Sequence, residues 1–271
     1  MRLIINENQL RLLVKEELGV LQGVYDEAVR VFKTIVSDLP NREKEDGGGS
    51  YTIQRGSVGS EIDGYQFKIS YQYRNFLNKE EVDKYGESCL VTGGSAYLGR
   101  YHIICNINLY GINGTIVKEK AVEVIQHELE HILQQFRSQK TIPNNMLYAK
   151  MRNDMESSDE KRHKVGRLIY GCLKSEQDGF INGLYSYCMV DNFATPPYDY
   201  SNISNSEVGK LYIELIEIFD DVKNDIELKK ILKEYKWSLK KVEKCINELI
   251  HKIGRVLVKV NNDKSKFGWR I

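Results

Sequence analysis

Two histidines are separated by one helical turn in the segment VIQHELEHILQQ, residues 124–135. Successive residues of a helix rotate by about 100°, so His127 and His131 would lie about 40° apart on one face. Apolar residues of the same predicted helix would lie on its opposite side: Val122, Ile125, Leu129, Ile132 and Phe136. The spacing therefore predicts a helix that packs on one side and presents two imidazoles on the other.

Two histidines at this spacing can bind a single tetrahedral zinc ion. Glu128 would lie beside the metal, where its carboxylate can take a proton from a zinc-activated water and return it to a leaving amine. We predict one Zn²⁺ per chain, bound by His127 and His131, with Glu128 as the general base. The alternative is a surface helix with two solvated histidines, although Val124 and Leu133 beside them make that face less than fully polar.

A catalytic zinc needs a third protein ligand, and the best candidate is Glu176 in LKSEQDGFINGLYSY, residues 173–187. This stretch is predicted to be helical, and Glu176 precedes Phe180 by one turn, on or beside the apolar face. A buried carboxylate is costly, and a metal would offset that cost. Alternatively, Ser175 and Asp178 form a capping box and Glu176 is an ordinary acid of the first turn.

Other residues are weaker candidates. The rival third ligands are His163, Glu160, Glu156 and Asp191. His102 and His251 are expected to be structural. Asp178 could orient a ligand histidine. Tyr185 or Tyr187 could stabilise an oxyanion, although the chain has 17 tyrosines and composition does not select among them.

The H-E-x-x-H string resembles the active-site helix of the zincin metallopeptidases. The strand-like segment 100–111 lies directly upstream, as the edge strand does in that superfamily. Gln134 and Arg137 exclude the metzincin continuation, whereas gluzincins take a glutamate from a later helix. The resemblance covers about residues 100–190. It implies a zinc metalloendopeptidase acting on a peptide or protein that pairs with the edge strand.

The order of elements predicts an α+β, zincin-like fold. A strand at 2–5 and two helices before Pro40 are followed by a glycine-rich loop, a β-rich region up to residue 111, and the H-E-x-x-H helix. The rest is mainly helical, with a last strand at 254–263. We predict a single catalytic domain, 1–271, in two lobes: 1–140, with the sheet and the H-E-x-x-H helix, and 141–271, which is helical.

Composition narrows the possible partners. The net charge of +1 does not favour nucleic acid or membrane binding, and the basic stretch 222–253 reads as amphipathic helix with a solvated lysine face. No apolar run of about 18–20 residues and no secretory signal is visible. Five scattered cysteines indicate reduced thiols. The expected location is the bacterial cytoplasm or a virion.

The opening LIINENQLRLLVKEE, residues 3–17, loosely resembles N-terminal segments of proteins from phages of Bacteroides-like bacteria. This resemblance implies a phage or bacterial source. It leaves open a non-catalytic, zincin-like structural or virion-associated role, and a role as an effector that cleaves one host protein. A virion or host protein is then a further expected partner.

Overall fold

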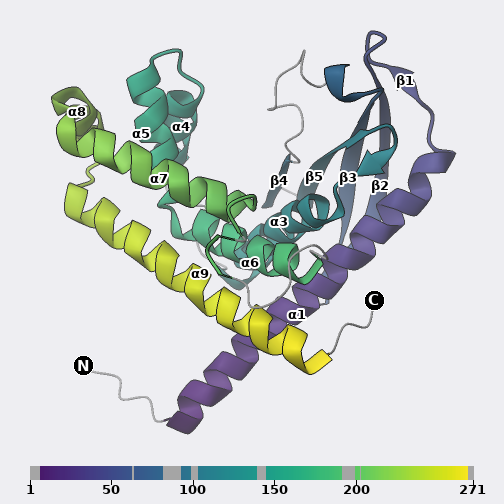
Figure 1. Cartoon of the computed structure of the whole chain (residues 1–271), viewed down its shortest axis with the longest axis horizontal. Coiled ribbons are helices and arrows are strands. Elements are labelled where there is room, and N and C mark those ends of the chain that lie inside the picture. The colour runs from purple at the N-terminus through teal and green to yellow at the C-terminus, as the bar shows by residue number, and fades with distance from the viewer. Residues whose placement is uncertain are drawn as a thin grey trace. The chain divides into compact units, whose positions relative to one another are not determined.

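The computed structural model describes residues 7–62, 64–81, 93–98, 103–138, 145–190, 199–201 and 203–267 of the 271-residue chain. The predicted fold class is confirmed, because a mixed sheet forms the N-terminal half and helices form most of the C-terminal half (Figure 1). The chain divides into two compact units, Met1–Glu130 and His131–Ile271. This division falls inside the H-E-x-x-H helix α3 (Lys118–Ser138).

The first unit holds one long helix and the sheet. Its elements, in chain order before α3, are α1 (Glu7–Asp38), a 3-10 turn η1 (Leu39–Asn41), β1 (Glu45–Asp46), β2 (Tyr51–Ile62), β3 (Tyr65–Phe76), β4 (Gly93–Leu98), β5 (Ile103–Ile112) and β6 (Thr115–Ile116). The strand order is β1-β2-β3-β5-β4, and β6 pairs with β5. Only β3 and β5 run parallel; the other pairs are antiparallel.

One face of the sheet is buried. Val58, Ile69 and Cys105 stand side by side in register on β2, β3 and β5, and all three are buried. Alternate residues of a strand share a face, so Ser60 and Tyr71 lie on this same side. Helix α1 packs along β2 (Figure 1). Ser60 Oγ donates a hydrogen bond to Glu27 of this helix, and Tyr71 Oη donates one to Asp38.

The prediction that segment 100–111 forms the sheet edge is wrong. β5 lies between β3 and β4, and β4 is the end strand on that side among the described residues. β5 carries Cys105, Ile107 and Leu109 on its buried face, as an interior strand with two neighbours should. On this side of the sheet, strand addition by an extended peptide would therefore involve β4 and not β5.

Helix α1 is one continuous helix where two were predicted. Glycines interrupt the apolar pattern near residues 19 and 23, but a glycine costs a helix only about 1 kcal/mol. Packing outweighs this cost, because Val24, Ala28, Val31 and Ile35 are buried at helical spacing. The helix ends before Pro40, as predicted. The strand predicted at residues 2–5 lies outside the described residues.

The turn predicted at residues 111–115 is confirmed. Asn113 and Gly114 both have positive φ values, 49° and 80°, and join β5 to β6 as a two-residue hairpin loop. Asn-Gly is the sequence that favours this turn. β6 is then followed almost directly by α3, which matches the helix predicted from residue 117 to residue 137.

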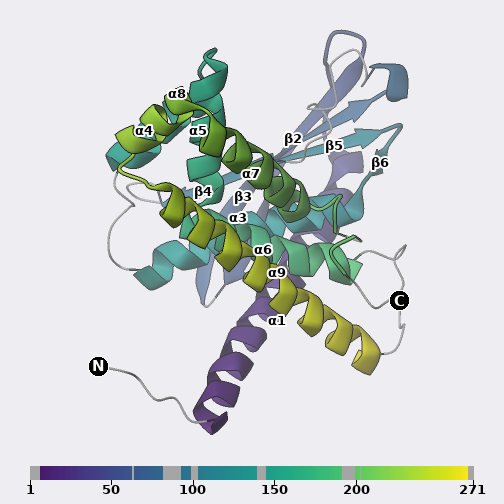
Figure 2. The same cartoon turned by 60° about the vertical axis from the view of Figure 1, so that its left-hand side comes forward.

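The second unit is helical. After α3 its helices are α4 (Asn145–Met155), α5 (Glu160–Gly171), α6 (Lys174–Val190), α7 (Glu207–Asn224), α8 (Ile226–Glu234) and α9 (Leu239–Phe267). Helix α6 packs against α9 and α7, and α5 packs against α4, α7 and α8 (Figure 2). No helix among the described residues has the length and apolar content needed to cross a membrane.

The strand predicted at residues 254–263 is wrong, because this segment continues α9. Its valines alternate as in a strand, but Ile253, Val256, Leu257 and Val260 also recur at helical spacing. These four side chains are buried, whereas Val258 is 62% exposed. Burial of one helical stripe extends the apolar face that Val242, Ile246 and Leu249 begin.

Candidate metal centre

The structure brings the three predicted ligands together. His127, His131 and Glu176 each offer a ligand atom, and these atoms all lie within 4.8 Å of one another. Within the described part of the chain, this His–His–Glu cluster is the one group of three or more potential ligands at such distances. Because α3 is continuous, His127 and His131 are one turn apart, as predicted.

The cluster fits zinc by its donor set. Two ligand atoms at about 2.0–2.2 Å from a tetrahedral zinc are about 3.3–3.5 Å apart. His131 Nε2 lies 3.5 Å from Glu176 Oε2, within the second unit. Two imidazole nitrogens and one carboxylate oxygen are also a combination used at catalytic zinc sites, where a fourth position stays open for water or substrate.

Glu176 is buried, although it lies in the first turn of α6 where acids are usually solvated. Its exposed fraction is 6%, and its carboxylate faces His131 of α3. Glu160 occupies the equivalent first turn of α5, is exposed, and pairs with Lys164 one turn along. A first-turn acid is therefore not in itself a ligand; the burial beside histidine distinguishes Glu176.

Three residues that were not predicted to support the site hold the end of α6 beside α3. Gln134 Nε2 donates a hydrogen bond to the carbonyl of Ser175 at 3.3 Å, and Gln134 Oε1 lies 3.4 Å from His131 Nδ1. Tyr148 Oη of α4 lies 2.8 Å from Ser175 Oγ. Contacts of this kind fix the ring orientation of a metal-binding histidine.

Tyr148 also faces Glu176. Burial raises the pKa of the Tyr148 hydroxyl, and the charge of Glu176 together with a hydrogen bond to it acts in the same direction, whereas the bond to Ser175 lowers it. Gln134 could have been found in the sequence, since it is three residues after His131 on one helix. Tyr148 could not, because nothing in its local sequence distinguishes it from other tyrosines.

Glu128 lies on the side of α3 that faces the sheet. It is 5% exposed and close to Cys105 of β5 within the first unit. Burial raises the pKa of the Cys105 thiol, and the negative charge of Glu128 raises it further. The general base proposed from the sequence is thus in a largely dry environment, where electrostatic interactions are stronger than in water.

The rival ligands lie elsewhere. His163 is exposed, and its Nδ1 lies 2.6 Å from the carbonyl oxygen of Met155. Glu156 and Glu160 are exposed and pair with Arg152 and Lys164. His251 is exposed on α9. The remaining rival, Asp191, and His102, which was expected to be structural, lie outside the described residues.

The expected roles of Asp178 and Tyr185 are not supported by their contacts. Asp178 accepts a hydrogen bond from Lys252 Nζ at 2.6 Å, and it forms an ion pair with this lysine of α9. Tyr185 donates to Asp263 Oδ2 at 3.0 Å, and nine residues turn it about 180° away from Glu176. Tyr187 shares the side of Glu176 but lies about 16 Å along α6.

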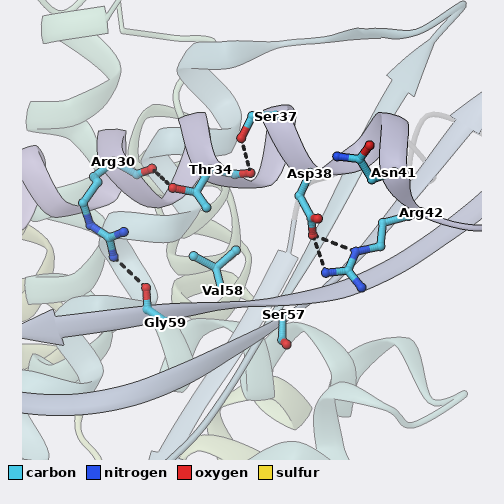
Figure 3. Close-up of a pocket in the computed structure, with 9 residues that line it drawn as sticks. All are labelled: Arg30, Thr34, Ser37, Asp38, Asn41, Arg42, Ser57, Val58 and Gly59. Carbon is cyan, nitrogen blue, oxygen red and sulfur yellow. Dashed lines mark hydrogen bonds and ion pairs between the residues drawn. The ribbon is translucent and has the colours of Figure 1, made fainter.

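A separate polar pocket of about 380 Å³ lies in the first unit, between α1 and β2. Figure 3 shows its two arginines engaged with neighbouring groups: Arg30 Nη2 donates to the carbonyl of Gly59 at 2.6 Å, and Arg42 pairs with Asp38 at 2.7 Å. None of the predicted site residues lines this pocket. It is therefore distinct from the His–His–Glu cluster.

Comparisons with protein families, with curated proteins and with solved structures gave no match to this chain. The resemblance to zincins therefore depends on residues 127–131 and on the later glutamate alone.

Proposed function

We propose that this chain is a zinc-dependent endopeptidase in which His127, His131 and Glu176 bind zinc and Glu128 is the general base. One observation carries the proposal: an H-E-x-x-H helix and a buried glutamate from a distant helix offer three ligand atoms within 4.8 Å. The histidines were expected to share a face from their spacing, but Glu176 was free to lie anywhere. Its approach to His131 is the support that the sequence alone does not contain.

The residues have separate tasks. Bound zinc would supply Lewis-acid polarisation of the scissile carbonyl and lower the pKa of a water molecule. With zinc bound by these ligands, the Glu128 carboxylate would act as the base that takes a proton from such a water and as the acid that returns it to the leaving amine. Gln134, Tyr148 and Ser175 hold the His131 ring and the first turn of α6 in position. The substrate class is a peptide or protein.

The test is the variant Glu128→Gln, which keeps the shape of the side chain and removes the base. Zinc content should stay near one per chain, while cleavage of a mixed peptide library should fall by about 10²–10⁴-fold. Glu130→Gln is the matched control, because Glu130 is also buried on this turn of α3 but points about 160° away from Glu128. The control should keep both zinc and activity.

The outcomes separate the alternatives. Cleavage by Glu128→Gln at the rate of the wild type would exclude the proposed base. Zinc near one per chain without cleavage of any peptide would favour the non-catalytic, zincin-like role, including a virion-associated one. A zinc content near zero that added zinc does not restore would leave His127 and His131 as ordinary helix residues and remove the basis of both proposals.

A further inference from the structure

Two cysteines from distant parts of the second unit lie in contact. Cys172 follows α5 and is buried, and Cys245 lies on α9 and is partly exposed. The Cys245 thiol donates a hydrogen bond to the carbonyl oxygen of Cys172 at 2.8 Å. Among the described cysteines, Cys105 and Cys188 are buried and form no disulfide, and they serve as a comparison.

The surroundings make the two thiols unequal. The neighbouring Cys172 lowers the pKa of Cys245, and the charges of Lys252 and Lys241 act in the same direction, against burial and the charge of Glu248. Gln177 Nε2 approaches Cys245 Sγ at 3.6 Å and its carbonyl oxygen at 3.2 Å. Nearby cations and hydrogen-bond donors favour a thiolate, which is the reactive form of cysteine. Cys245 is also the partly exposed thiol of the pair, so an oxidant in solution reaches it before the buried Cys172.

Cys172 is suited to react second, after Cys245. The neighbouring Cys245 and burial both raise the pKa of the Cys172 thiol. It is held beside Cys245 because Gln177 also donates to the carbonyl of Gly171, which fixes the end of α5 against α9. A low-pKa, accessible thiol beside a second thiol is the arrangement of redox-sensitive cysteines.

We propose that Cys172 and Cys245 are a hydroperoxide-reactive dithiol, in which Cys245 is oxidised first and Cys172 then closes a disulfide. The Cys245 thiolate attacks one oxygen of hydrogen peroxide; an S–O bond forms, the O–O bond breaks, and hydroxide leaves as water after protonation. Cys172 loses its proton and attacks the Cys245 sulfur, so that the S–S bond forms and the S–O bond breaks. The dithiol gives two electrons to the peroxide, and two waters are released.

The experiment uses the full chain, treated with hydrogen peroxide, alkylated and digested with trypsin without reduction. Trypsin should release residues 168–174 and 245–252, each with one of the two cysteines. We expect these peptides to appear joined, two hydrogens lighter than their sum, and to separate after dithiothreitol. This cross-link should form at least about tenfold faster than any that includes Cys105 or Cys188, because burial disfavours their thiolates.

Two variants test the order of the steps. Cys172→Ala should leave a sulfenic acid on Cys245 that dimedone traps, whereas Cys245→Ser should leave Cys172 as a thiol. Three results on the wild-type chain would overturn the proposal: both cysteines remaining thiols, Cys245 passing to sulfinic acid without a cross-link, or Cys105 or Cys188 cross-linking as fast. None of these readouts depends on zinc or on peptidase activity, so the proposed function can fail independently.

Discussion

Helix α4 contributes to two clusters that each contain a buried carboxylate, and the two carboxylates are stabilised by different kinds of partner. Towards its end, Asp154 accepts hydrogen bonds from Lys150 and Arg162 at 3.2 and 3.4 Å and from Tyr235 at 2.5 Å. At its beginning, Tyr148 faces Ser175 and Glu176, and Glu176 faces His131. Both acids are at most 6% exposed.

The difference lies in the kind of positive partner. Lysine and arginine carry a permanent charge, so the group formed by Lys150, Asp154, Arg162, Glu234 and Tyr235, the Asp154 network, is complete without a ligand. A histidine is charged only when protonated, and its neutral form is a metal ligand. The comparison shows that burial of an acid does not by itself indicate a metal site. The type of residue beside the acid is the better indicator.

The largest effect is expected from Glu176→Gln, which removes a ligand from the His–His–Glu cluster and keeps its size. Zinc affinity should fall by more than about 100-fold. This is a larger loss than the one expected when a residue that only hydrogen-bonds to a zinc ligand is changed. Elemental analysis and competition with a chelator measure this. Added zinc should raise the unfolding temperature of the wild type but not of the variant, since a ligand stabilises the state that binds it.

Glu160→Gln is the matched control, because Glu160 is the first-turn acid of α5 and is exposed. It should bind zinc like the wild type. Equal zinc binding by Glu176→Gln and Glu160→Gln would mean that Glu176 is an ordinary first-turn acid. The His–His–Glu cluster would then not differ from the Asp154 network in binding a metal.

The Asp154 network should determine stability instead. Asp154→Asn leaves Lys150 and Arg162 without their buried acceptor, and we expect a loss of about 2 kcal/mol in the free energy of unfolding. Urea denaturation measures it. Asp220→Asn, which breaks the exposed pair with Lys223, should cost under about 0.5 kcal/mol. Zinc binding should be unchanged in both variants.

A reciprocal pair of tyrosine variants sharpens the comparison. Tyr148→Phe removes the hydroxyl beside Ser175 and should weaken zinc binding by about tenfold with little loss of stability. Tyr235→Phe removes the hydroxyl that Asp154 accepts from and should cost about 1 kcal/mol of stability. Zinc competition and urea denaturation on both variants test the separation. Loss of zinc affinity in Tyr235→Phe would show that the clusters are coupled.

The smallest expected effect is the one that replacing Asp154 has on the acid dependence of stability. Burial alone would raise the pKa of Asp154, but hydrogen bonds from Tyr235 and Lys150 and the charges of Lys150 and Arg162 outweigh it and lower the pKa. The unfolded carboxyl then binds its proton at a higher pH than the folded one. This contribution to stability is therefore complete above about pH 5 and is lost as the pH falls through the lowered pKa.

Asp154→Asn removes this contribution, so its urea midpoint should change less between about pH 5 and about pH 3.5 than that of the wild type. The same fall in both proteins would mean that other acids account for the acid sensitivity. Glu27 and Asp38 of the first unit also have lowered pKa values and supply a background that the variant leaves intact.

Local patterns in the sequence predicted those features of the structure that depend only on residues close together in the chain. The one-turn spacing of His127 and His131, the Asn-Gly turn before α3 and the apolar stripe of α3 are each set by a few consecutive residues. The same reasoning failed where one pattern suits two structures, as at residues 254–263, because alternating valines also fit a helix when another surface buries one stripe. It also misplaced β5, since strand order depends on pairing between distant segments.

The sequence by itself therefore determined the α+β class and the helix that carries the two histidines one turn apart, because helical geometry is local. Tertiary structure decided which acid would meet them. Glu160 and Glu176 both open helices, and only packing of α4 and α6 beside α3, through Tyr148, Ser175 and Gln134, buries one of them next to His131. The same long-range packing set Cys172 against Cys245, which no spacing in the sequence indicates.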